Sequence, residues 1–404
     1  MSPPFRSGGA GTDGSRRRFV AGFARGLMVL PWMGRTLGGA PAGEADEEAV
    51  WFPARAEWAR AGCRDGREER NPGSEEIVSP AGDLQAAMDR VAARGGGRVR
   101  LGPGDYELRA PLLLRSHVVL QGAGPGRTRL LLLLRGAFPG KALDARGFST
   151  WTTGLLAVGE RGAFVEDLSI VFDPSLPPPP TLRTEREAFV NDPGGRTDLY
   201  VVGLRFSGCE DCCVRRVQIL NAGSHPLMIE ASRHLTVETV TIDGSHNKGG
   251  LGNGYVNLTR STHVLLTGLH VRDVRHLSIQ NSDARYPCRY NVLVRSQLEV
   301  DVNFHNGDAG HNLVQDCRIA VPTWHWWGPF AVGVPGQHQP PGPGNLVYRC
   351  DATRVYPDPK RNRREAILPD RVYRIRDHFD TSVPLVGDFA PAPKAGTLVP
   401  VGAG

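Results

Sequence analysis

A six-residue pattern recurs within the chain and limits the folds that the chain can adopt. Residues 312–317 (Asn-Leu-Val-Gln-Asp-Cys) are echoed 33 positions later by residues 345–350 (Asn-Leu-Val-Tyr-Arg-Cys). Two weaker matches align 213–219 with 235–241, at an offset of 22 positions, and 263–266 with 291–294, at an offset of 28 positions. Short β-rich units at such variable spacings are typical of a coil with three short strands in each turn and loops of different lengths between them.

A coil of this kind has no fixed size, because each turn packs only on its neighbours. The 404 residues therefore do not have to be divided among several compact domains. Leucine-rich repeats share the period, but the sequence lacks their Leu-x-x-Leu-x-Leu and Asn pattern. It also lacks the recurrent amphipathic helices that a compact α/β fold needs. We predict an all-β protein built on one parallel β-helix solenoid.

One short amphipathic helix is predicted just before the repeats. Apolar residues at positions i, i+3, i+4 and i+7 form its buried stripe: Leu84, Ala87, Met88 and Val91. Asp83 is suited to cap the first turn. Three successive glycines at 95–97 end the helix.

Two segments after this helix carry a family resemblance. Residues 97–106 (GRVRLGPGDY) and 117–124 (HVVLQGAG) resemble the N-terminal signature of the pectate-lyase-like superfamily of right-handed parallel β-helices. The resemblance is firm over residues 77–135 and continues as periodicity to residue 355. It implies that the short helix caps the open end of the coil, where unpaired strand edges otherwise invite association. The superfamily includes lyases, glycoside hydrolases, epimerases, esterases and non-catalytic adhesins, so the fold leaves the chemistry open.

The first 42 residues have the layout of an export signal. Residues 15–20 (Ser-Arg-Arg-Arg-Phe-Val) resemble the twin-arginine motif, an apolar stretch follows to residue 37, and Ala-Pro-Ala at 40–42 predicts cleavage after Ala42. A basic disordered arm is the alternative. Six arginines and one aspartate give this segment +5 of the formal net charge of +6, so the remainder carries only +1. We therefore expect a secreted or periplasmic protein that meets the twin-arginine translocase during export, and not a nucleic-acid partner.

The domain plan follows from these observations. We expect a signal peptide at 1–42, a polar lead-in at 43–76, the β-helix at 77–355 and an irregular segment at 356–404. No segment outside the signal has the ~20 apolar residues of a membrane span. The seven cysteines all follow residue 42, where export would permit disulfides, and the odd number leaves at least one unpaired.

The polar residues that can carry chemistry lie in three clusters on successive predicted turns. Residues 243–255 form a glycine-rich insertion with His246, Lys248 and Tyr255, for which a mobile turn is the alternative. In residues 301–312, Asp301, Asn303 and His305 share one face of a strand, while Val302 and Phe304 face the core. The alternative for this second cluster is a structural ladder of Asn and Asp side chains at the turns.

The third cluster comprises Asp273, Arg275, His276 and Gln280 on the preceding turn. An offset of 28 positions predicts that Asp273 lies beside Asp301, one strand spacing (~4.8 Å) away. Two such carboxylates are the acid and base that a glycoside hydrolase uses. A further aromatic group at residues 324–327 suits stacking on sugar rings, or packs as a loop cluster of its own.

The residue types favour a polysaccharide lyase over this hydrolase, because β-elimination at a uronic acid needs a base and a cation near the substrate carboxylate. The predicted catalytic residues are His246, Lys248, Asp301, His305 and Asp308. The predicted substrate-binding residues are Tyr255, Arg275, His276, Asn303, His311, Trp324, Trp326 and Trp327. No metal site is predicted with certainty; calcium held by Asp301 and Asp308 is the one cofactor considered. A glycan-binding adhesin without catalysis is the remaining alternative.

Overall fold

The structure is a computed structural model. It describes residues 54–64, 74–183, 187, 197–249, 252–322, 324–325, 328–333, 336–348, 350–354, 372–375 and 378–379. The predicted signal peptide and its cleavage site lie outside these residues, so the export signal stays a prediction. In the described part, no helix is long and apolar enough to cross a membrane.

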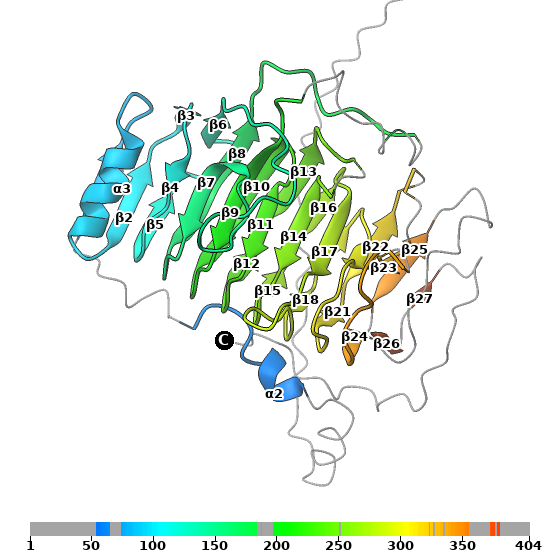
Figure 1. The fold of residues 1–404 in the computed structure, drawn as a ribbon. Helices are drawn as coiled ribbons and strands as arrows, with labels where there is room; N and C mark the ends of the chain where they lie inside the picture. The colour runs from blue at the N-terminus through cyan, green and yellow to red at the C-terminus, as the bar shows by residue number, and fades with distance from the viewer. Residues whose placement is uncertain are drawn as a thin grey trace, which may run out of the picture. The chain divides into compact units, whose positions relative to one another are not determined.

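The described strands form three parallel ladders that the chain visits in turn (Figure 1). The first ladder contains β1 (Glu75–Val78), β2 (Gly97–Leu101), β5 (Val118–Gln121), the first parts of β8 (Phe164–Phe172) and β10 (Cys213–Ala222), β12 (Thr236–Glu238), β15 (Leu265–Thr267), β18 (Val292–Val294), β21 (Leu313–Gln315), β24 (Asn345–Tyr348) and β26 (Val372–Ile375). The second ladder contains β3 (Gly104–Leu108), β6 (Thr128–Leu132), the second parts of β8 and β10, β13 (Thr241–Ser245), β16 (His270–Arg272), β19 (Gln297–Leu298), β22 (Arg318–Val321), β25 (Asp351–Arg354) and β27 (His378–Phe379).

The third ladder contains β4 (Leu112–Leu113), β7 (Thr152–Val158), β9 (Val201–Ser207), β11 (Leu227–Glu230), β14 (Tyr255–Thr259), β17 (His276–Gln280), β20 (Val302–Phe304) and β23 (Phe330–Val332). One strand from each ladder makes one turn. The prediction of a parallel β-helix with three short strands per turn is therefore confirmed.

The register confirms one of the predicted matches and corrects two. Leu313 pairs with Leu346, as the match between 312–317 and 345–350 predicts. Cys213 pairs with Thr236, whereas the predicted match placed it opposite Leu235. Leu265 pairs with Val292, whereas the predicted match placed it opposite Leu293. Each wrong match is displaced by a single position, and because side chains alternate between faces such a slip exchanges inward and outward positions.

Aligned apolar side chains from successive turns fill the coil. In the second ladder the register stacks one buried column: Ile170, Ile219, Ile242, Val271, Leu298 and Ile319. All but Leu298 are β-branched, and β-branched side chains have a high preference for the pleated, buried surface of a strand. Every member is at most 1% exposed, so the interior is continuous from turn to turn.

The corners of the coil are made by two kinds of residue. Between the first and second ladders, a residue in the left-handed conformation turns the chain: φ is 51° at Arg216, 55° at Thr239 and 51° at Asp316. At the corner before the first ladder, Asn312 accepts a hydrogen bond from the backbone N–H of Asn291, and Asn345 accepts one from that of Asn312. This asparagine ladder satisfies buried donors where the strands end.

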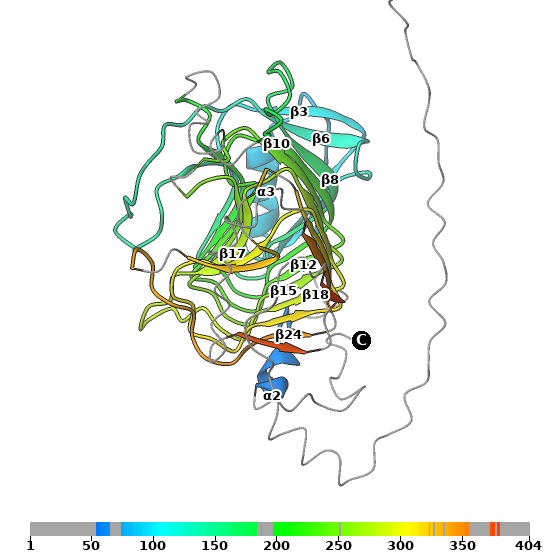
Figure 2. The same ribbon diagram turned by 90° about the vertical axis from the view of Figure 1, so that its right-hand side faces the viewer.

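Helix α3 (Leu84–Ala93) closes the N-terminal end of the coil, as predicted (Figure 2). Its buried residues are Leu84, Ala87, Met88 and Val91. The carboxylate of Asp83 accepts a hydrogen bond from the backbone N–H of Ala86 at 2.9 Å. The predicted helix, its cap and its buried stripe are all confirmed.

The segments flanking the predicted β-helix contain more order than expected. In the lead-in, helix α2 (Arg55–Trp58) packs Trp58 against the outer face of the first ladder, and its indole N–H donates to the backbone oxygen of His311 at 2.6 Å. The segment 356–404 was predicted to be irregular. Strands β26 and β27 lie within it and extend the first and second ladders, because each can pair its backbone with the preceding turn.

Candidate active site

A cleft of about 840 Å³ lies on the outer face of the third ladder. Alternation along β14 places Tyr255, Asn257 and Thr259 in this cleft, while the intervening Val256 and Leu258 belong to the core. The segment from Phe138 to Ser149 and the residues Gln337 and His338 also line the cleft. It is a concave surface lined by both apolar and polar side chains, as ligand-binding sites are.

Three of the predicted site residues line the cleft together: Tyr255, Arg275 and His305. The rings of Tyr255 and His305 meet edge to face at a centroid distance of 5.9 Å. His305 also contacts the ring of His338 at 4.4 Å. Burial lowers the pKa of His305 to about 3, so its imidazole is neutral near pH 7.

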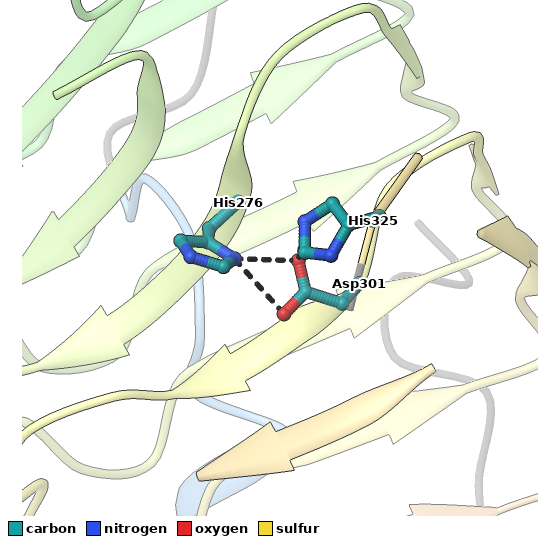
Figure 3. Close-up of side chains that lie close together, drawn as sticks. All are labelled: His276, Asp301 and His325. Carbon is teal, nitrogen blue, oxygen red and sulfur yellow. Dashed lines mark hydrogen bonds and ion pairs between the residues drawn. The ribbon is translucent and has the colours of Figure 1, made fainter. Parts of the chain in front are cut away.

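The side chains of His276 and Asp301 point toward each other (Figure 3). The Nδ1 atom of His276 lies 2.7 and 3.0 Å from the two carboxylate oxygens of Asp301. The amide of Asn303 donates to Asp301 Oδ2 at 2.9 Å. The predicted parity of this strand is correct, because Val302 and Phe304 face the core. However, Asp301 and Asn303 are fully buried instead of lining an open groove.

His325 covers Asp301 from the loop between β22 and β23. Its Nε2 lies 3.3 Å from Asp301 Oδ1 and 2.5 Å from the backbone oxygen of Arg275. Burial opposes ionisation of Asp301, but the two imidazoles more than offset it and hold the pKa of this carboxyl well below its usual range. Burial lowers the pKa of His276 to about 4, so Asp301 is charged and His276 is neutral near pH 7.

Glu230 is the one carboxylate among the described residues that line the cleft. It accepts hydrogen bonds from the hydroxyl of Ser149 at 2.7 Å and from Arg205 at 3.0 Å. The hydroxyl of Ser207 and the guanidinium of Arg260 also donate to it. With 1% exposure and four side-chain donors, Glu230 is engaged as a structural anion.

The predicted carboxylate pair is wrong. In the register of β17 and β20, Leu277 pairs with Val302, which places His276 and not Asp273 opposite Asp301. Asp273 instead forms an ion pair with the ammonium of Lys248 at 2.6 Å. The predicted offset fails here because the turn of the coil that separates β17 from β20 is shorter than that offset assumes.

Lys248 and His246 are also outside the cleft lining. The Lys248 ammonium is fully buried, donates to the backbone oxygen of Pro180 at 2.9 Å, and has its pKa lowered by burial. His246 packs edge to face on Phe172, with ring centroids 5.6 Å apart. Because neither side chain reaches the cleft, we do not retain their predicted catalytic role.

Asp308 and His311 belong to the corners of the coil. Asp308 Oδ1 accepts from the amides of Asn312 at 3.1 Å and Asn345 at 2.9 Å, so it extends the asparagine ladder. Burial raises the pKa of Asp308 to about 6. His311 stacks on Tyr290 at a centroid distance of 5.8 Å. The alternative of structural Asn and Asp ladders is therefore the correct one for Asp308.

The predicted tryptophan surface is not found in the described residues. Trp324 is buried, packs on Leu182 and on the ring of His325, and is not among the residues that line the cleft. Trp326 and Trp327 lie outside the described residues. Trp151 lines the cleft instead, with Phe138 and Tyr200 around it.

Sequence reasoning missed five residues of this region: Trp151, His225, Glu230, Asn257 and His325. The first four occupy outward positions of the third ladder or the turns before it, and the correct register would have grouped them. His325 lies within the aromatic group at residues 324–327, and nothing in that pattern singles it out. Its contact with Asp301 spans a loop, for which the sequence holds no periodic signal.

A calcium site at Asp301 and Asp308 stays a prediction. Asp301 bonds to His276 and Asn303, whereas Asp308 bonds to Asn312 and Asn345, so the two carboxylates have separate sets of partners. Among the described residues, a different group of side chains places its possible metal-ligand atoms within 4.8 Å of one another. This group is His276, Asp301 and His325.

No family model matches the sequence, and no curated protein is detectably similar to it. The catalytic domain of a GH87 alpha-1,3-glucanase in complex with nigerose aligns at 13% identity with a TM-score of 0.46, over 73% of this chain and 47% of that one. This chain thus spans about half of the glucanase chain. A pectin methylesterase from Erwinia chrysanthemi aligns at 10% identity with a TM-score of 0.40, over 77% and 90% of the two chains. An endo-xylogalacturonan hydrolase from Aspergillus tubingensis aligns at 13% identity with a TM-score of 0.42, over 70% and 73%. All three scores are below 0.5, so the fold assignment rests on the strand pairing of this chain.

Proposed function

We propose that this protein is a carbohydrate-active enzyme that binds a polysaccharide in the cleft over the third ladder. Aromatic rings line the cleft at Phe138, Trp151 and Tyr255, and amides line it at Asn257 and Gln280. Trp151 and Tyr255 are buried, at 8% and 3% exposure, so the half-buried Phe138 offers the ring surface on which a sugar can stack, and the amides exchange hydrogen bonds with sugar hydroxyl groups. The volume of about 840 Å³ lies within the range of ligand-binding clefts.

The finer proposal is a lyase that cleaves a uronic-acid-containing glycan. The observation that carries it is that Tyr255, Arg275 and His305 meet in a cleft whose described carboxylate, Glu230, is fully engaged. A neutral His305 can take the proton α to the uronate carboxylate. Tyr255 can return a proton to the departing sugar oxygen, while Arg275 neutralises the carboxylate that becomes an enolate.

Asp301 and His276 act in this proposal as positioning residues. Asp301 holds Nδ1 of His276, and the His276 ring meets that of Tyr255 edge to face at 4.8 Å. Tyr255 is therefore held from behind, in the orientation that faces His305. We further propose that the protein acts after export, on the strength of the twin-arginine pattern at residues 15–20.

The experiment that tests the reaction is a glycan panel incubated with the purified protein. A lyase raises both the ultraviolet absorbance of unsaturated uronides and the number of reducing ends. Reducing ends without the absorbance would establish a hydrolase in its place, and binding without either signal would establish an adhesin. Running the panel with added calcium and with a chelator tests the predicted metal dependence in the same assay.

A further inference from the structure

We propose that His276, Asp301 and His325 bind a first-row divalent cation, zinc above all, in a closed site behind the cleft. The three ligand atoms lie within 4.8 Å of one another (Figure 3). They come from three places in the fold: the first residue of β17, the residue before β20, and the loop between β22 and β23. The first two face each other on adjacent turns, and the loop supplies the third.

The two donor separations that involve Asp301 can be compared with those of a tetrahedral zinc site. Bonds of about 2.1 Å to nitrogen and oxygen place tetrahedral ligand atoms about 3.4 Å apart. His325 Nε2 and Asp301 Oδ1 are already 3.3 Å apart. His276 Nδ1 and Asp301 Oδ1 are 2.7 Å apart, so this pair must open by about 0.7 Å, which a rotation of either side chain provides.

The donor types select the class of metal. Two imidazole nitrogens and one carboxylate suit zinc and its first-row neighbours, whereas calcium takes six to eight oxygen ligands. All three side chains are 0% exposed, so the site is enclosed. This cation site is thus distinct from the calcium site considered for Asp301 and Asp308.

Asn303 completes the surroundings of the proposed ligands. Its amide nitrogen donates to Asp301 Oδ2 at 2.9 Å and so orients the carboxylate. Its oxygen is buried and has no hydrogen-bond partner among the described residues, which leaves an acceptor for a water molecule bound to the cation. Groups that orient ligands in this way raise metal affinity.

A network of hydrogen bonds alone is the competing interpretation. In that state His325 shares an Nε2–H between Asp301 and the backbone oxygen of Arg275. Metal binding requires the bare Nε2, with the proton on Nδ1 of the same ring. The two interpretations differ in whether the folded protein retains a cation, and this difference does not depend on the proposed reaction.

The test measures retained zinc in the full chain, purified without a histidine tag. The protein is treated with a chelator, incubated with zinc chloride, desalted and analysed for metal by mass spectrometry, and its zinc affinity is titrated. Wild type should retain about one zinc per chain. His325→Gln should bind zinc at least ~10–100-fold more weakly, and Asn303→Ala should also lose affinity. Cobalt loading should give the visible absorption bands of a tetrahedral site in wild type only.

His311→Gln is the matched control, because this histidine lies at a corner outside the site and should leave zinc binding unchanged. Asp301→Asn adds a second ligand variant, and circular dichroism shows whether each variant folds. If Asp301→Asn does not fold, His325→Gln still decides the question. Wild type without stoichiometric zinc, or equal zinc in wild type and His325→Gln, would overturn the proposal.

Discussion

Asp308 is a buried carboxyl whose surroundings make stability depend on pH. Burial raises its pKa to about 6, above the ~3.9 of an unperturbed Asp. The folded protein therefore binds more protons than the unfolded chain between about pH 4 and pH 6, and stability falls as pH rises through this window. Cys288, the neighbouring titratable group, has its pKa raised to about 12 by burial and does not titrate there.

Asp308→Asn should remove this pH dependence. The side-chain oxygen of Asn can still accept from Gly310, Asn312 and Asn345, and it carries no charge. We expect a higher free energy of unfolding than wild type above pH 6, by at most about 3 kcal/mol, and no gain at pH 4. Urea unfolding of both proteins from pH 4 to pH 8 measures this difference in the free energy of unfolding. An unchanged pH slope would mean that another group is responsible.

Phe304, the last residue of β20, and His305, which follows it, should have opposite roles. His305→Ala should abolish most activity and cost about 1 kcal/mol of stability or less, because His305 is half-buried at the cleft. Phe304→Ala removes a fully buried ring and should cost about 3–5 kcal/mol, with activity retained in the folded fraction. Thermal melts and glycan assays on both variants separate the two effects. The reverse pattern would place His305 in the core.

The parity of this strand was predictable from sequence, whereas the burial of its outer face was not. Alternation separates Asp301 and Asn303 from Val302 and Phe304 without knowledge of any partner. What covers Asp301 is His325, which arrives through a loop after another complete turn of the coil. A local pattern carries no information about such a contact. The sequence therefore predicted correctly that these side chains face outward, but wrongly that they are exposed.

Asparagine side chains hold successive turns in register, and Asn312 lies at the middle of this ladder. Its oxygen accepts from the backbone and side-chain nitrogens of Asn291, and its own amide donates to Asn345. Asn312→Ala leaves buried donors without partners, at about 1–3 kcal/mol for each. Chemical denaturation should show this loss. Arg318→Ala, on an exposed position of β22, should change stability by about 0.5 kcal/mol or less. If the two variants lost equal stability, the asparagine ladder would have no special structural role.

The residues at the corners of the coil explain which turns could be aligned from sequence. The match between 312–317 and 345–350 was found correctly because Asn312 and Asn345 are matched corner residues. Where corners are formed by single left-handed residues of varied type, such as Arg216 and Thr239, no shared letter marks the position. The alignments at those turns slipped by a single position, and a similar misalignment paired Asp273 with Asp301 in place of His276.

At the scale of the whole molecule, the fold was predictable and the cleft was not. The pattern repeats over many turns, so the prediction of the solenoid and its capping helix does not depend on the alignment of any one pair of turns. The cleft depends on loops of unequal length, and these bring Trp151, Glu230 and His305 together from distant turns. Its chemistry therefore had to be read from the assembled structure.

The last prediction concerns how the whole chain is routed. Residues 1–42 carry +5 and the remainder only +1, so Arg16→Lys with Arg17→Lys preserves the charge of the leader while replacing both planar guanidinium groups. A receptor that reads paired arginines should reject this variant, and the protein should accumulate in the cytoplasm with its fold unaltered. Cell fractionation with immunoblotting measures the location, and circular dichroism measures the fold. Arg25→Lys with Arg35→Lys is the matched control, since it makes the same chemical change outside the motif. Export that continues in the Arg16 and Arg17 variant would show that residues 15–20 are not a twin-arginine signal.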